Sequence, residues 1–164
     1  MRSDLRGRPP DVSRILPNLL VGEYPRVADA GWLQSEHGVS AVLSLQHESD
    51  LWDKGVALDE LEREYRDRTI EFRHVPVEDT SESDLDAALP RAVAVLQDLI
   101  ARGHTVFVHC NAGYNRSPTV AIAYLCIDRA MPLDDAVLAV KQRRACVPYV
   151  TLLRKRFGSV SVMA

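Results

Sequence analysis

The segment VHCNAGYNRSP, residues 108–118, decides the fold of this 164-residue chain. It continues a run of β-branched and aromatic residues, TVFVH at 105–109, which predicts a buried strand. It leads into a predicted helix from Ser117 to Arg129, in which Pro118 suits the first turn because its missing N–H has no partner there. A strand, a tight loop and a helix therefore follow one another directly.

The same alternation extends through the rest of the chain. Short apolar runs predict a hairpin or edge strand at 15–21 and strands at 39–45 and 70–77. Helical patterns occupy 27–37, 58–66, 85–101, 133–144 and 150–157. The expected fold class is therefore α/β, with a single mostly parallel central sheet flanked by helices and a helical C-terminal third. We expect a flexible N-terminal arm at 1–13 and one domain at 14–160.

Composition excludes several classes of protein. The chain is 46% hydrophobic and 26% charged, which is typical of a globular domain. Its three cysteines show no CxxC spacing, which argues against a disulfide scaffold and a structural zinc site. No apolar run reaches the length of a membrane span, and no secretory signal opens the chain. We expect a cytoplasmic protein that binds neither membrane nor metal.

Charge is distributed unevenly around a formal net charge of −3. Residues 116–156 contain eight Lys and Arg against three Asp, a net of +5, so the remainder of the chain carries −8. This imbalance favours an anionic ligand near the C-terminal third over general nucleic-acid binding. Solvated helix faces are the alternative explanation.

The loop after the strand has the composition of an anion-binding nest with a nucleophile at its base. Backbone N–H groups between a strand end and a helix N-terminus converge on one point, where they bind a tetrahedral dianion. Gly113 lets the backbone approach the ligand closely, and Asn115 tolerates a left-handed conformation better than most residues do. The same positive field favours the thiolate of Cys110. The predicted phosphate-binding residues are Asn111, Ala112, Gly113, Tyr114, Asn115 and Arg116.

These residue types predict phosphoryl transfer to sulfur. Cys110 attacks phosphorus in line while Arg116 presents two N–H groups to the phosphoryl oxygens. Ser117 donates to the sulfur and makes it a better leaving group when water attacks. The leaving group needs a proton from an acid elsewhere in the chain. No metal or other cofactor is needed, because Arg116 and the amides neutralise the charge.

The pattern His109-Cys110-x5-Arg116-Ser117 resembles the signature of the cysteine-dependent, protein-tyrosine-phosphatase superfamily. The small size resembles its atypical dual-specificity branch, over residues 15–157. Within that branch the chain is most similar to the glucan phosphatases, laforin and the plant starch phosphatases. The shared features are Leu16-Pro17-Asn18-Leu19, Val21-Gly22, Leu45-Gln46, residues 110–113 and residues 141–148. The resemblance implies that 14–160 is a dual-specificity phosphatase domain with a phosphocysteine intermediate.

The resemblance also implies a general acid about thirty residues before the nucleophile. Asp79 lies 31 residues upstream of Cys110, just after the predicted strand at 70–77. Asp84 is the second candidate, although it is also placed to cap the following helix.

Substrate and partners stay open at this point. Phosphoglucan is the first expected substrate, a phosphotyrosine or phosphoserine/threonine protein is the alternative, and phosphoinositides are less favoured because Arg116 is the only cation of the loop. An inactive phosphate-binding module and a sulfurtransferase are the remaining readings. Trp52, Tyr114 and Arg144 are candidate substrate contacts; for Arg144 a solvated helix end is the alternative, and Trp32 is expected in the core.

Overall fold

A single five-stranded sheet forms the centre of the computed structural model, which describes residues 6–158. Its strands are β1 (Val12–Leu16), β2 (Leu19–Gly22), β3 (Ala41–Ser44), β4 (Glu71–His74) and β5 (Val106–His109), in the spatial order β1-β2-β5-β3-β4. β1 pairs antiparallel with β2, and the other neighbouring strands pair in parallel. The predicted mostly parallel sheet and the opening hairpin are confirmed.

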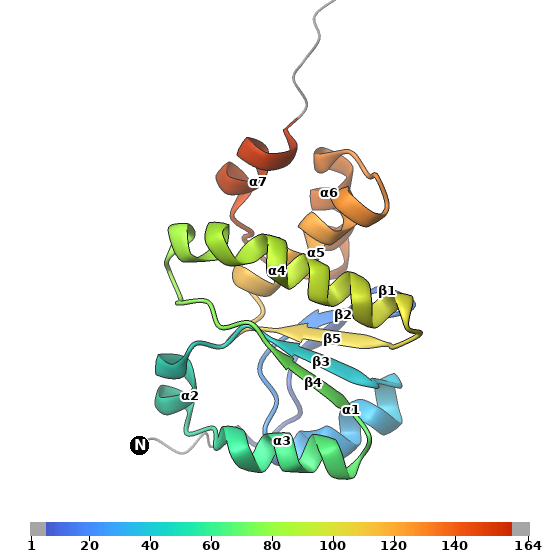
Figure 1. Ribbon diagram of the computed structural model, residues 1–164, viewed down its shortest axis with the longest axis vertical. Coiled ribbons are helices and arrows are strands. Elements are labelled where there is room, and N and C mark those ends of the chain that lie inside the picture. The colour runs from blue at the N-terminus through green and yellow to red at the C-terminus, as the bar shows by residue number, and fades with distance from the viewer. Residues whose placement is uncertain (1–5, 159–164) are drawn as a thin grey trace, which may run out of the picture.

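Helices cover both faces of this sheet (Figure 1). One side carries the 3-10 turn η1 (Val27–Asp29) with α1 (Ala30–His37), α2 (Glu48–Lys54) and α3 (Leu58–Asp67). The other side carries α4 (Glu82–Ala101), α5 (Arg116–Asp128), α6 (Leu133–Arg143) and α7 (Val150–Phe157). The predicted α/β class and helical C-terminal third are confirmed. Helix α2 was not predicted.

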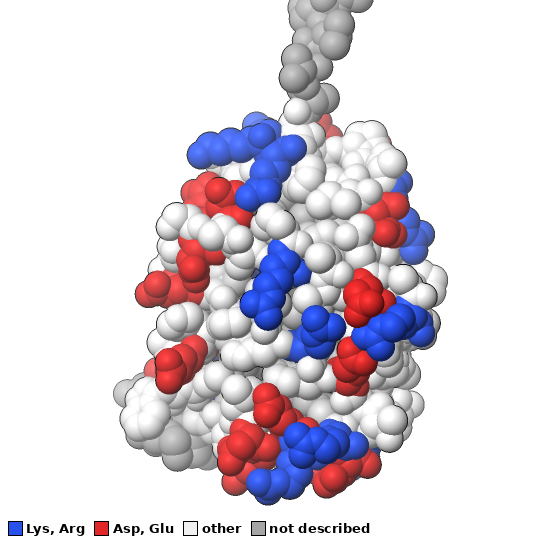
Figure 2. Space-filling model, in the orientation of Figure 1, with Lys and Arg blue, Asp and Glu red and all other residues white. Residues whose placement is uncertain are grey.

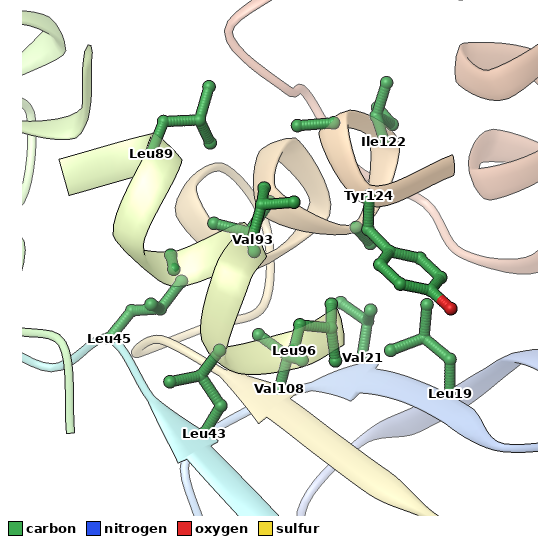
Figure 3. Packing of buried hydrophobic residues seen from close by; sticks show 14 of the residues in the cluster. Leu19, Val21, Leu43, Leu45, Leu89, Val93, Leu96, Val108, Ile122 and Tyr124 are labelled. Carbon is green, nitrogen blue, oxygen red and sulfur yellow. The ribbon is translucent and has the colours of Figure 1, made fainter. Parts of the chain in front are cut away.

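Two apolar clusters fill the space between sheet and helices, because alternate side chains of a strand point to opposite faces. Leu19 and Val21 of β2 and Val108 of β5 face α4 and α5, where Figure 3 shows them beneath the apolar side of α4. Leu20 and Phe107 point the other way, toward α1 and α3. Trp32 packs against this second cluster, as predicted.

The N-terminal arm contacts the domain over the part that the structure describes. Arg6 pairs with Glu23 and Asp29 and donates to the carbonyl of Tyr24 at 3.0 Å. Arg26 donates in turn to the carbonyls of residues 6 and 8. Residues 6–11 thus lie against the connection that follows β2, whereas residues 1–5 of the predicted arm lie outside the described residues.

Basic side chains gather over α7 at one end of the molecule, while acidic and basic groups alternate over α3 at the other (Figure 2). The last turn of α7 carries Arg154, Lys155 and Arg156. Two further cations of the C-terminal third, Arg116 and Arg144, are buried instead. Within residues 6–158, no helix is both long and apolar enough to cross a bilayer.

Candidate active site

The candidate loop lies where three parallel strands end together. It leaves β5 after His109 and enters α5 at Arg116. The chain that follows β3 supplies Gln46 and then α2, and the chain that follows β4 supplies Asp79. Ligands of α/β sheets bind beyond the carboxyl ends of the strands, so this edge is the expected place for a site.

Each peptide carbonyl of the loop from Cys110 to Asn115 accepts a hydrogen bond. The carbonyl of Cys110 faces His109 Nδ1 at 3.1 Å, and that of Asn111 accepts from the amide of Tyr24 at 2.9 Å. The carbonyls of residues 112 and 113 accept from Arg144 at 2.9 and 2.6 Å. Those of residues 114 and 115 accept from the amides of Val147 and Thr119 at 2.9 and 3.2 Å.

Because the loop carbonyls bond to groups that surround the loop, they point away from its centre. This direction fixes the direction of the amides. In a trans peptide, the N–H points opposite to the preceding carbonyl. Carbonyls 110–115 therefore turn the amides of residues 111–116 toward the other side of the loop, at the N-terminus of α5. Convergent amides at a helix N-terminus form a binding site for a phosphate-like anion.

Gly113 is required by two independent constraints. Its φ of +68° lies in the left-handed region, which side chains other than glycine rarely adopt. A Cβ at this position would stand 2.5 Å from the carbonyl carbon of Gly22 and 2.6 Å from Arg144 Nη2. The loop is therefore pressed against the end of β2 at Gly113. This close contact is with Gly22 and Arg144, whereas the sequence predicted a close approach to a ligand.

Asn115 acts differently from its prediction. Its φ is −119°, so the tolerance for a left-handed conformation is not used. Its side-chain amide instead donates to the carbonyl of Val147 at 2.7 Å. Asn115 thus ties the loop to the segment that follows α6.

Cys110 lies at the base of the loop and is 2% exposed. Its Sγ is 3.3 Å from Ser117 Oγ, which is the contact predicted for a hydroxyl that stabilises the sulfur as a leaving group. The neighbouring His109 is fully buried, and burial lowers its pKa to about 4. Its Nδ1–H donates to the Cys110 carbonyl, because a carbonyl only accepts. The neutral imidazole of His109 thus orients the first peptide of the loop through its hydrogen bond to the Cys110 carbonyl.

Arg116 is held by a carboxylate that the sequence analysis did not identify. Its Nη1 donates to Asp50 Oδ2 at 2.6 Å and to the carbonyl of Val77 at 2.8 Å. Asp50 also accepts from Asn111 Nδ2 at 2.8 Å, and Asn111 accepts from Gln46. Burial opposes the charged guanidinium, but the hydrogen bond with Asp50 and the neighbouring anionic groups raise the pKa of Arg116, so it stays a cation.

The hydrogen bonds of Arg116 are all made by Nη1 among the described residues. Its Nε is buried and forms no hydrogen bond with any described residue. A carboxylate oxygen of Asp79, Oδ1, lies 3.5 Å from this Nε. A buried donor without an acceptor is costly, so this N–H marks a place for a ligand oxygen.

The two candidate acids occupy different environments. The side chain of Asp79 is 45% exposed, and its Oδ1 lies beside Arg116 at the loop. Asp84 instead accepts from the amide of Glu78 at 2.7 Å, while its own amide is capped by Ser81 Oγ. Asp84 therefore stabilises the start of α4, and of the two candidates Asp79 is the one that lies beside Arg116 at the loop.

Arg144 lies behind the loop. It is buried, and its guanidinium bonds the loop carbonyls on one side and Ser13 Oγ on the other, at 3.2 Å. The solvated helix end considered for Arg144 is therefore wrong, and its contacts favour positioning of the loop over contact with substrate.

The other two candidate contacts are exposed. Trp52 is 72% exposed on α2, the helix that also carries Asp50. Tyr114 is 48% exposed within the loop itself. Across residues 6–158, no group of three or more His, Cys, Asp or Glu side chains is arranged to hold a metal ion.

Comparison with known proteins agrees with this geometry. The family model described as "Dual specificity phosphatase, catalytic domain" matches residues 19–154. The chain belongs to the dual specificity phosphatase family. The loop residues predicted a cysteine-dependent phosphatase. Membership of this family confirms that prediction.

Two curated members of the dual specificity phosphatase family illustrate the similarity. Mouse laforin (Mus musculus) is 33% identical over 124 residues, which is 69% of this chain and 38% of laforin. Human dual specificity protein phosphatase 2 (Homo sapiens) is 31% identical over 133 residues, 81% of this chain and 38% of that protein. The chain thus spans less than half the length of these relatives.

Solved structures share the dual specificity phosphatase fold. Tk-PTP in its active form superposes with a TM-score of 0.74 at 21% identity and covers 90% of this chain and 95% of its own. PTPMT1 in complex with PI(5)P gives a TM-score of 0.76 at 23% identity, with 90% and 94% covered. These similarities confirm the predicted fold.

Proposed function

We propose that residues 14–160 form a catalytic domain that hydrolyses phosphomonoesters through a phosphocysteine intermediate. The observation that carries this proposal is that all six loop carbonyls, from Cys110 to Asn115, accept hydrogen bonds from other groups of the domain. It leaves six amides for the oxygens of one phosphoryl group, together with the Nε–H of Arg116, which donates no hydrogen bond. Donors that are already oriented stabilise the charge of the transition state at no cost of reorganisation.

In the first step the Cys110 thiolate attacks phosphorus, a sulfur–phosphorus bond forms and the ester oxygen–phosphorus bond breaks. The departing oxygen takes its proton from the carboxylic acid of Asp79. Arg116 and the loop amides bind the three equatorial oxygens throughout. The position of Asp79 beside Arg116 supports this role.

In the second step water attacks the phosphocysteine. The Asp79 carboxylate takes a proton from the water, the sulfur–phosphorus bond breaks, and inorganic phosphate and the thiolate are released. The Ser117 hydroxyl, 3.3 Å from Sγ, stabilises the departing thiolate. No metal or cofactor enters either step. A free thiol nucleophile is suited to a reducing compartment, which supports the cytoplasmic location we propose.

Phosphoglucan is the substrate that we propose first. Trp52 and Tyr114 present exposed aromatic faces on α2 and on the loop, and such faces pack well against sugar rings. The similarity to laforin supports the same choice. A phosphotyrosine or phosphoserine/threonine protein is the alternative, which the similarity to human dual specificity protein phosphatase 2 supports.

The test is phosphate release from para-nitrophenyl phosphate, a phosphotyrosine peptide and solubilised phosphoglucan, with Cys110→Ser as the inactive control. We expect phosphate release from all three substrates, with the fastest release from phosphoglucan. Preference for the peptide with little release from glucan would support the protein phosphatase. No release from any substrate would contradict hydrolysis and leave a phosphate-binding module.

The intermediate has its own test. Ser117→Ala should slow the second step more than the first, so that rapid quenching and intact-protein mass spectrometry detect phosphorylated Cys110. A variant that loses activity without accumulating this species would contradict the assigned role of Ser117.

A further inference from the structure

Gln46 is fully buried in the connection from β3 to α2, and the proposed mechanism gives it no role (Figure 1). Its backbone is held on both sides. The amide donates to Ser44 Oγ at 3.3 Å, and the carbonyl accepts from His74 Nε2 at 2.6 Å. Its side-chain Nε2 donates to Asn111 Oδ1 at 2.9 Å. Gln46 therefore joins the sheet to the loop residue that follows Cys110.

Two further side chains continue this contact to Arg116. Asn111 Nδ2 donates to Asp50 Oδ1 at 2.8 Å, and Asp50 Oδ2 accepts from Arg116 Nη1 at 2.6 Å. Gln46, Asp50 and Arg116 are all buried, so water competes little for these hydrogen bonds. Four side chains thus form one line of hydrogen bonds, which runs from a buried glutamine to the arginine of the loop.

The carboxylate of Asp50 decides the orientation of both amide side chains. Because an ionised carboxylate only accepts hydrogen bonds, Asn111 must turn its NH2 group toward Asp50 and its Oδ1 toward Gln46. Gln46 must then present its own NH2 group to that oxygen. Its Oε1 is left buried, with no hydrogen bond from any described residue. Native proteins rarely bury such an acceptor unpaired, which indicates that this orientation serves the site and not the stability of the fold.

We propose that Gln46 is a positioning residue for Arg116. It acts through Asn111 and Asp50, and the inference rests on the proposed phosphatase function. The NH2 group of Gln46 fixes the side chain of Asn111, which in turn fixes one oxygen of Asp50. The other oxygen of Asp50 holds the guanidinium of Arg116, so that its Nε–H faces the phosphoryl group. Without the first contact the amide of Asn111 rotates, and the carboxylate loses its alignment.

The kinetic test uses Gln46→Met, which removes the donor and the unpaired acceptor but keeps most of the side-chain volume. We expect kcat for para-nitrophenyl phosphate to fall about tenfold, with a change in KM of less than about twofold, since a small misplacement of a catalytic group has costs of this order. A wild-type kcat for this variant would overturn the proposal.

Unfolding in urea distinguishes positioning from a merely structural role. The midpoint for Gln46→Met should equal or exceed that of the wild type, because the variant buries no unpaired acceptor at this position. Asn111 is half-buried, so water replaces the donor that its Oδ1 loses. A lower midpoint in proportion to the loss of kcat would assign Gln46 to the stability of the fold and overturn the proposal.

Gln34→Met is the matched control. Gln34 also donates one hydrogen bond, to the carbonyl of Arg68 at 2.9 Å, but it lies on α1. This variant should keep the wild-type kcat, and a tenfold loss here as well would contradict a specific role of Gln46.

A double variant tests the route through Asp50. Gln46→Met/Asp50→Asn should lose about as much kcat as Asp50→Asn alone, since the effects of residues in one hydrogen-bond network are not additive. A further tenfold loss in the double variant would show that Gln46 acts independently of Asp50 and would overturn the proposal.

The side-chain Nε–H signal of Arg116 in nitrogen-15 NMR, assigned by its loss in Arg116→Lys, needs no turnover. It should shift and broaden in Gln46→Met and keep its wild-type position in Gln34→Met. An unchanged signal in Gln46→Met would overturn the positioning role even in an active enzyme. A shifted signal in a protein that releases no phosphate from any substrate would keep the positioning role and refute hydrolysis alone.

Discussion

Asp50 Oδ2 lies 2.6 Å from Arg116 Nη1, and both side chains are almost fully buried. The carboxylate fixes one end of the guanidinium, so that the Nε end points to the place left for phosphoryl oxygens. Asp50 touches no reacting atom in the proposed mechanism, so it is a positioning residue for Arg116.

Asp50→Asn should therefore lower kcat more than it raises KM, by about 10- to 100-fold in kcat. Misplacement of a catalytic group by about 1 Å has costs of this order. Steady-state kinetics with para-nitrophenyl phosphate measures the changes in kcat and in KM separately. The control is Asp53→Asn on the same helix, where the carboxylate is exposed. Equal changes for Asp50→Asn and Asp53→Asn would contradict the positioning role.

Arg144→Met should destabilise the domain and disorder the loop. The substitution keeps much of the apolar stem but leaves the carbonyls of residues 112 and 113 without this donor. The hydrogen bond at Gly113 is buried, and a buried unsatisfied group costs about 1–3 kcal/mol. Urea unfolding measures the loss, and the KM for para-nitrophenyl phosphate should rise in parallel. The adjacent, exposed Arg143 gives the control Arg143→Met, for which unfolding should change by less than about 0.5 kcal/mol.

Asp79→Asn and Asp84→Asn should produce different defects. Asp79→Asn should lower kcat about 100- to 1,000-fold for esters with poor leaving groups and much less for activated esters, which need no proton. Asp84→Asn should leave kcat near wild type and reduce stability by about 1 kcal/mol, because it weakens the start of α4. A large kcat effect of Asp84→Asn, with little effect of Asp79→Asn, would reverse the assignment.

Acid should destabilise the fold through His109. Its pKa is about 4 in the folded protein, against 6.5 for an ordinary histidine, because burial disfavours the charged ring. The unfolded chain therefore binds more protons between these values, and stability falls as the pH drops from about 6.5 to about 4, by about 3 kcal/mol in total. Unfolding free energies from pH 7 to pH 4 test this. His109→Gln should flatten the dependence, and an unchanged slope would contradict it.

The strands and most helices were predictable because their side chains repeat with the period of the element. The run at 105–109 has the β-branched composition of β5, and α4 carries Leu85, Leu89, Val93 and Leu96 at helical spacing. Helix α2 lacks such a pattern. Its sequence, ESDLWDK, buries only Asp50 and Leu51, and its N-terminus is marked by the side chain of His47, an uncommon capping residue.

The chemistry of the loop was predictable because its residues are contiguous in the sequence. The residues that hold the loop in place were not predictable. Cys110, Arg116 and Ser117 lie within eight residues, and local geometry brings them together. Asp50 is 66 residues from Arg116, and no spacing rule connects them. Arg144 looks like a helix-end cation in the sequence, and only the packing of α6 beside β1 reveals that it serves the loop.

The outward carbonyls of the loop have a consequence for biosynthesis. Their donors include the amide of Tyr24, which is made long before Cys110, and Arg144 and Val147, which are made after it. A nascent chain that ends soon after α5 already contains the motif but lacks the segment after α6 that carries Arg144 and Val147. The loop therefore has all the donors to its carbonyls only when residue 147 has been made.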